Sequence, residues 1–224
     1  MADYEEMTAS KKLAAFIEKN QKAFIAILIV LVCCLIAYIV CASVAKSGKA
    51  KNLQTLDEIS YELTSKSSEL EDAEIEARIA TALEKAAPLT KKGGVVGARA
   101  NMFCAELAFR QEKYEDAANY WKEAAAKAKK SYLAPISYFN LATCYENLGN
   151  VDAALENYKI AADNNDFVMK PHAMFSYARI LETKGDYATA AAAYTELNDN
   201  FPSDSWANLA KSRLIALKNE GKIE

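Results

Sequence analysis

The sequence predicts an all-α protein with a single transmembrane helix, a helical hairpin, an α-solenoid of repeated helix pairs and a C-terminal capping helix. Three observations support this prediction. Glycine (7 residues) and proline (4 residues) are scarce, while alanine and straight-chain helix formers are abundant. One N-terminal stretch carries no charge over a membrane-spanning length. Beyond it, the chain repeats a pattern of small and aromatic residues.

The anchor is predicted from the apolar run at 24–45, which contains no charged residue and is flanked by Lys22 and Lys46. As a helix this run is about 33 Å long, enough to cross a hydrocarbon core of about 30 Å. We therefore assign residues 23–46 to a transmembrane helix, which makes the membrane a partner of the chain. The alternatives are a buried core helix and a cleaved secretory signal, although the run exceeds the usual apolar length of a signal.

The cysteines of the apolar run raise one further alternative, a lipid-modified N-terminus. Cys33 and Cys41 each follow a valine, Val32 and Val40, which is larger than a signal peptidase usually accepts. A thiol within such a run otherwise behaves as a small apolar side chain. Retention of the anchor without lipidation is the preferred interpretation.

Residues 1–22 are predicted to form a short lead before the anchor, which the resemblance of the whole layout, given below, implies is cytoplasmic. Leu13, Phe16 and Ile17 follow helical spacing, so this segment is either an amphipathic helix on the membrane surface or a solvated lead-in to the anchor.

Residues 47–89 are predicted to form a helical hairpin, because apolar residues recur at helical spacing in 48–66 and again in 71–87. Pro88 is expected to stop the second helix, since it has no amide donor. The sequence TKKGGVVG at 90–97 is the best candidate for a hinge, because paired glycines have little conformational preference.

The repeats are three stretches, 105–125, 142–162 and 178–198, that superimpose without a gap. Alanine occupies two matched positions in each stretch, and an aromatic residue or valine occupies two others. Small residues let two helices approach at their crossing, and large ones fill the space around it. The matched sets are Ala105, Ala142 and Ala178; Tyr114, Val151 and Tyr187; Ala117, Ala154 and Ala190; and Trp121, Tyr158 and Tyr194.

Glycine marks the turn inside two of the three repeats, at Gly149 and Gly185. Glycine adopts left-handed backbone angles without strain, which suits a tight turn between two helices. The first repeat has Glu112 and Lys113 there, so its turn is expected to use a different conformation.

The pattern over residues 98–202 resembles three tetratricopeptide repeats. In the middle repeat the resemblance lies in Leu141, Ala142, Tyr145 and Gly149, and in the third repeat it extends to Pro202. The first repeat departs most, with Asn101 and Cys104 at two signature positions. The periods exceed the family's usual 34 residues because KAKKSYLAP and DNNDFVMKP lengthen the connections. Residues 203–224 are predicted to form the capping helix and tail, with Ser203 or Asp204 as the N-cap.

The resemblance implies a protein-binding groove lined by the first helix of each repeat, mixing apolar and charged side chains. The alternative is that these residues are partly buried against neighbouring helices. The predicted groove residues are Met102, Glu106, Phe109, Arg110, Phe139, Thr143, Glu146, Asn147, His172, Phe175, Arg179 and Glu182. The lysine and asparagine clamp with which some relatives hold a C-terminal carboxylate is absent at the matched positions.

Composition argues against other classes of function. The formal net charge is −3 with both signs interspersed, which disfavours a nucleic-acid surface. There is no phosphate loop or nucleophile elbow, and His172 is the single histidine, so we expect no enzyme, cofactor, metal site or small-molecule substrate. Cys104 and Cys144 are expected to be buried free thiols, with a disulfide as the alternative.

The whole layout resembles the YfgM-like ancillary subunits of the bacterial Sec translocon. That resemblance implies an inner-membrane protein with a cytoplasmic N-terminus and periplasmic repeats, which would link the translocon to periplasmic chaperones or client proteins. The flanking lysines do not decide the orientation. The alternative function is that of a structural assembly factor of a cell-envelope complex.

Overall fold

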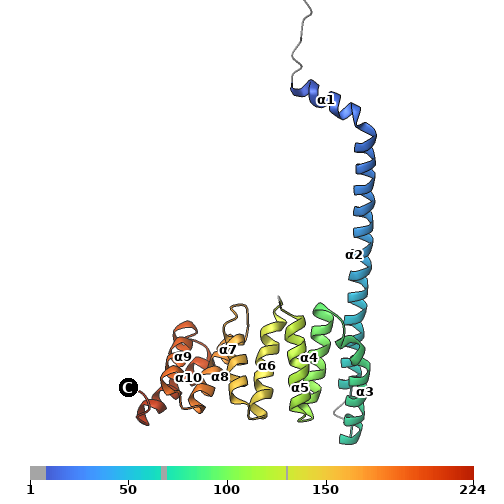
Figure 1. Cartoon of the computed structure of the whole chain (residues 1–224). Coiled ribbons are helices and arrows are strands. Elements are labelled where there is room, and N and C mark those ends of the chain that lie inside the picture. Colours follow the sequence, from blue (N-terminus) through green and yellow to red (C-terminus); the bar gives the residue numbers. More distant parts are fainter. Residues whose placement is uncertain (1–8, 67–69, 130) are drawn as a thin grey trace, which may run out of the picture. The chain divides into compact units, whose positions relative to one another are not determined.

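The computed structural model describes residues 9–66, 70–129 and 131–224. The acidic beginning of the predicted lead, residues 1–8, lies outside the described residues. The described part contains ten α-helices and no strand, and the chain divides into two compact units, one ending at Lys51 and one covering Asn52–Glu224 (Figure 1). The all-α solenoid predicted from the sequence is confirmed.

The first unit contains α1 (Ala9–Lys19) and most of α2 (Gln21–Thr64). Leu13, Phe16 and Ile17 are exposed on α1, and the Phe16 ring packs edge-on against Phe24 at 6.0 Å. The apolar run is helical throughout, and all its side chains are exposed. By length and composition α2 is able to cross a membrane.

The second unit begins with the last turns of α2, which pair with α3 (Asp72–Thr90). Leu56 and Ile59 of α2 share a core cluster with Ile79 and Ala82 of α3. The helices are antiparallel, because Arg78 near the start of α3 donates to the carbonyl of Ser65, just after α2, at 2.6 Å.

Two expectations about the end of the hairpin are wrong. The second helix runs through Pro88 and ends at Thr90, because a proline in the last turn removes only one helical hydrogen bond. The segment 90–97 is not a hinge, since α4 (Gly94–Arg110) already begins at Gly94. A Cβ on Gly97 would lie 1.8 Å from the Lys92 carbonyl oxygen, so this glycine permits close packing instead of flexibility.

The repeats follow as antiparallel helix pairs in which each helix packs on the next (Figure 1). The first repeat begins at Gly94, four residues before the predicted start at residue 98. The capping helix is α10, and Asp204 is its N-cap, accepting from the Trp206 amide at 2.8 Å. The remaining bounds are α5 (Tyr114–Lys127), α6 (Leu133–Asn147), α7 (Val151–Ala162), α8 (Lys170–Thr183), α9 (Tyr187–Asn200) and α10 (Ser205–Asn219).

The repeated small and aromatic positions form the core between paired helices. All six matched alanines are fully buried, and Trp121, Tyr158 and Tyr194 are at most 2% exposed. Cys104 and Cys144 are buried free thiols in two different core clusters, and burial raises the pKa of Cys104 to about 11 and that of Cys144 to about 12.

The turns inside the three repeats share one conformation, contrary to the expectation for the first repeat. Glu112 has φ 58°, in the left-handed region that Gly149 (φ 71°) and Gly185 (φ 81°) also occupy. Each turn has the same pair of backbone hydrogen bonds, including Lys113 N–H to the Ala108 carbonyl at 2.9 Å in the first repeat. The fold therefore imposes this geometry even where the sequence provides no glycine.

Candidate protein-binding face

The predicted groove residues lie on the first helices of the three repeats, α4, α6 and α8. We call the side of these helices that carries them the first-helix face. Its α6 and α8 part and its α4 part differ in burial and in pairing.

The aromatic residues on α6 and α8 are core side chains. Phe139 is 8% exposed, and its ring lies 5.3 Å from that of Tyr158 and 4.7 Å from that of His172. Phe175 is 9% exposed and packs between Tyr194 and Trp206. The sequence left open whether these phenylalanines are buried, and in the folded chain they are.

His172 is half-buried and joins α8 to the capping helix. Its ring stacks on Trp206 of α10 with the centroids 3.8 Å apart and an interplanar angle of 7°. Burial lowers the pKa of His172, and the positive charge of Arg179 lowers it further. This histidine is a packing residue at neutral pH.

The charged residues on α6 and α8 form a repeated ion-pair network that joins successive repeats. Glu146 accepts a hydrogen bond from Tyr158 Oη at 2.5 Å and two from Arg179 Nη2, at 2.7 and 2.9 Å. Glu182 occupies the same position one repeat later, where it accepts from Tyr194 Oη at 3.1 Å and from Arg213.

Each unit of this network therefore joins three consecutive helices through one carboxylate. The hydroxyl of Thr143, also a predicted groove residue, lies 3.1 Å from Tyr158 Oη and extends the first unit. In the first repeat the positions equivalent to Glu146 and Tyr158 are Phe109 and Trp121, so the network is replaced there by apolar contacts.

The network favours the charged forms of Arg179, Glu182 and Arg213. Burial raises the pKa of Glu182, but hydrogen bonds from Arg213 and Tyr194 outweigh burial, and the pKa lies below its ordinary value. The hydrogen bond to Glu146 raises the pKa of Arg179. The Glu182 side chain is only 13% exposed. These groups are already satisfied by one another, so they stabilise the stacking of repeats.

The α4 part of the first-helix face is open. Met102 and Glu106 line a cavity of about 230 Å³ together with Arg99, at the junction of α4 with the last turns of α2. Arg99 pairs with Asp57 at 2.9 Å. The other lining residues are Leu56, Asp57, Ser60, Phe103 and Leu133.

Glu106 differs from the glutamates of the network. Among the described residues it makes no hydrogen bond and no ion pair, although Arg110 lies one turn away on α4. Burial raises its pKa, and the charge of Arg110 opposes that shift. Glu106 is an exposed carboxylate that lines the cavity beside apolar Met102 and has no direct partner, so it is suited to a cationic group with an apolar neighbour.

The remaining predicted residues, Phe109, Arg110 and Asn147, do not line the cavity. Phe109 packs edge-on against Tyr114 at 5.1 Å, Arg110 is exposed, and exposed Asn147 donates to the Thr143 carbonyl at 2.9 Å. The twelve residues therefore do not form one site. Met102 and Glu106 share a cavity, while Phe139, Thr143, Glu146, His172, Phe175, Arg179 and Glu182 are engaged in packing and pairing.

Sequence reasoning missed the contributions of the flanking helices. Asp57 and Ser60 of α2 line the α4 cavity, although they belong to the predicted hairpin. Arg213 and Trp206 complete the network and the aromatic stack from the predicted cap. The repeated Glu-to-Tyr spacing from 146 to 158 and from 182 to 194 was available as a signal for the network. No group of three or more potential metal ligands occurs among the described residues.

Comparison with known proteins identifies the repeats. A tetratricopeptide repeat family model matches residues 104–168 and 147–205. A TPR repeat-containing protein of Treponema pallidum (strain Nichols) is 37% identical over 139 residues, which cover 62% of this chain and 58% of that protein. The match thus spans less than two thirds of this relative's length. The chain contains tetratricopeptide repeats.

Solved structures show the same fold. Kinesin light chain nearly identical TPR-like repeats from Podosopora anserina superimpose with a TM-score of 0.57 at 11% identity, covering 78% of this chain and 89% of that one. A single-substitution variant of that protein gives the same TM-score and is covered over 88% of its chain. At this identity the likeness concerns the fold alone.

Proposed function

We propose that this chain is a membrane-anchored protein-binding scaffold whose partner docks at the α4 part of the first-helix face. The observation that carries the proposal is the cavity at the junction of α2 and α4, where Glu106 has no hydrogen-bonding partner among the described residues. Solenoids of helix pairs commonly bind extended segments of other proteins along such surfaces.

The chemistry of the cavity suggests what a partner segment contains. Leu56, Met102 and Leu133 supply an apolar lining, and methionine adapts its shape to different side chains. Glu106 supplies an acceptor for a charge-assisted hydrogen bond. We therefore propose a segment with an apolar side chain next to a lysine or arginine.

The membrane anchor is the second part of the proposal. The apolar run of α2 is long enough to span a bilayer, and tethering would raise the local concentration of the repeats around a membrane partner. The layout resembles translocon-associated proteins, so we propose an inner-membrane location with a cytoplasmic N-terminus and periplasmic repeats. The proposed partners are Sec translocon subunits, periplasmic chaperones or their clients.

The test is site-specific photocrosslinking of the full chain in bacterial cells. A photoreactive residue replaces Met102 in the cavity, and a matched control replaces exposed Lys122 on α5, the second helix of the same repeat. Translocon or chaperone crosslinks at 102 and their absence at 122 are expected. Equal products at both positions would contradict binding at this face.

Two further results separate the parts of the proposal. Recovery of one stable envelope complex without translocon subunits would instead favour the assembly-factor function. The orientation is tested separately by adding protease to spheroplasts, which should degrade residues 46–224. Full protection of these residues would contradict a periplasmic location.

A further inference from the structure

We propose that one edge of the solenoid docks on the lipid surface in which the anchor is embedded. This edge, called the inter-repeat edge below, consists of residues 91–93, 128–132 and 163–169, of which residue 130 lies outside the described residues. The inference rests on the proposed membrane anchor. It concerns a second surface, distinct from the α4 cavity.

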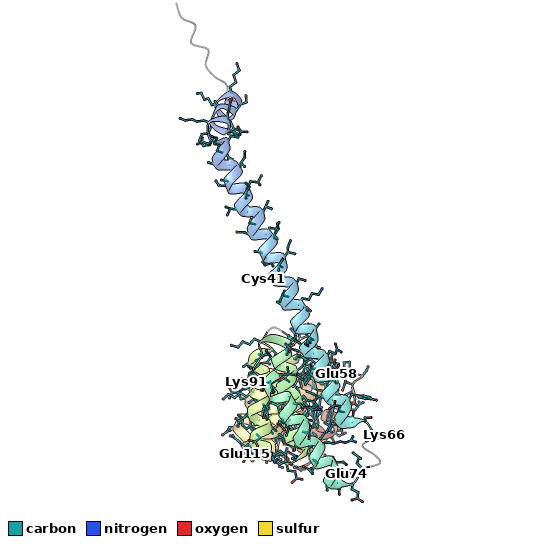
Figure 2. All side chains as sticks on the ribbon, turned by 90° about the vertical axis from the view of Figure 1, so that its right-hand side faces the viewer. Cys41, Glu58, Lys66, Glu74, Lys91 and Glu115 are labelled. Carbon is teal, nitrogen blue, oxygen red and sulfur yellow. The ribbon has the colours of Figure 1, made fainter. Side chains whose placement is uncertain are left out.

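Topology brings these segments to one edge. Successive helices of the second unit run in opposite directions, so the connections after α3, α5 and α7 lie together, opposite the turns after α4 and α6 (Figure 1). Figure 2 shows Lys91 near one end of the helices, with Lys66, Glu74 and Glu115 toward the other end.

The beginning of the second unit lies at the same edge. Asp57 of α2 pairs with Arg99 in the first turns of α4, whereas Ser65, just after α2, contacts Arg78 near the start of α3. Asn52, about one and a half turns before Asp57, is therefore at the end of the unit where α4 begins.

The covalent connection keeps this edge close to the bilayer. Only six residues, 46–51, separate the last residue of the apolar run from Asn52. They span about 9 Å as a helix and at most about 21 Å when extended. The opposite edge is farther from Asn52 by a helix length, about 21 Å for the 14 residues of α5.

The inter-repeat edge exposes apolar side chains that the solenoid does not need for its own packing. Val168 is 94% exposed, Tyr132 is 67% exposed and Met169 is 39% exposed. The neighbouring Phe167 is 5% exposed and packs against Phe139, which fixes the base of the loop. The loops 128–132 and 163–169 belong to the two connections that make these repeats longer than usual. Apolar and tyrosine side chains of this kind are favourable at a membrane interface.

The charge of the edge suits an anionic lipid surface. The described residues of the inter-repeat edge carry three lysines and two aspartates, and two further lysines, Lys127 and Lys170, border it. The described residues of the opposite turns, 65–72, 110–116 and 147–152, carry six acidic and three basic side chains. Basic residues near a membrane containing anionic lipids are attracted to it, while the acidic edge is repelled.

The experiment uses the full chain reconstituted in lipid nanodiscs, with serine replacing Cys33, Cys34 and Cys41. An environment-sensitive dye is attached at Val168→Cys and, as a matched control on the opposite edge, at Glu115→Cys. Quenching by lipids with a spin label just below the headgroups measures contact with the bilayer. Co-elution of the chain with the nanodiscs and its resistance to carbonate extraction report the anchor independently.

We expect quenching at position 168 to exceed that at position 115 at least about twofold with anionic lipids. Raising the salt to about 1 M, where the Debye length is about 3 Å, should reduce it. In the Lys91→Glu, Lys92→Glu double variant, loss of each lysine should weaken docking by about fivefold.

Equal quenching at both positions in an inserted chain would overturn the edge proposal alone. Failure of the chain to insert would overturn the anchor as well. Protection of residue 168 in native membranes but not in nanodiscs would indicate a protein partner and would overturn lipid docking.

Discussion

Replacing Glu182 by alanine should destabilise the last repeat more than any exposed ion pair could. Glu182 is the acceptor for Tyr194 Oη at 3.1 Å and for Arg213, and its side chain is 13% exposed. Tyr194 is fully buried, so its hydroxyl would lose its partner at a cost of about 1–3 kcal/mol. The Arg213 side chain is 42% exposed and would be hydrated, so its share is at most about 1 kcal/mol. The expected total is about 1–4 kcal/mol.

The assay is urea unfolding of the full chain in mild detergent, followed by tryptophan fluorescence in a Trp121→Phe background, so that Trp206 is the reporter. The matched control is Asp152→Ala, which removes a pair with Lys184 whose carboxylate is 84% exposed and should cost less than about 0.5 kcal/mol. Because stability in a solenoid is local, hydrogen exchange should increase mainly in α9 and α10.

A double-mutant cycle separates the two contributions of Glu182. Tyr194→Phe in the Glu182→Ala background removes the unsatisfied hydroxyl and should make the combined loss smaller than the sum of the single losses by about 1 kcal/mol or more. If Glu182→Ala behaved like Asp152→Ala, or if the cycle showed no coupling, the network would not stabilise the stacking of repeats.

Three further predictions follow from backbone geometry and titration. Glu112→Gly should raise the free energy of unfolding by about 0.5–1 kcal/mol in the same urea assay, since it relieves a left-handed residue, and a loss would contradict this reading of the turn. Gly97→Ala should lower it by about 1–3 kcal/mol, because the new Cβ would clash with the Lys92 carbonyl, and a neutral result would show that this contact relaxes freely. His172 has a lowered pKa in the folded state, so its contribution is fully present above about pH 6.5, its ordinary pKa, and is lost as pH falls through its folded pKa. Unfolding measured between pH 8 and pH 5 should show this loss in the parent chain but not in His172→Phe, and identical profiles would refute the assignment.

Local pattern is sufficient to predict the fold because the repeat positions are decided by packing. Ala142 and Tyr158 are buried wherever the helix pair forms, so their spacing alone indicates their role. The turn at Glu112 is not predictable in this way, because the two flanking helices impose a conformation that the residue's own preference does not indicate. Pro88 misleads for a related reason, since a proline in the last turn costs little.

The candidate site is harder to predict because exposure depends on contacts between repeats. Phe139 and Phe175 look like groove residues along the chain, but Tyr158, Tyr194 and Trp206 cover them. Glu146 looks like a free surface charge until Arg179, 33 residues later, is brought beside it. Glu106 on α4 makes no such contact among the described residues, and that difference becomes visible in three dimensions.

Binding through the α4 cavity is the central claim, and one measurement tests it most directly. The yield of photocrosslinked protein partner from position 102 is compared between the parent chain and Glu106→Arg, each as a full chain in its native membrane. Reversing the charge should reduce this yield at least about fivefold while the urea unfolding curve stays unchanged, because Glu106 makes no hydrogen bond or ion pair among the described residues. An unchanged yield in the folded variant would contradict docking at this cavity.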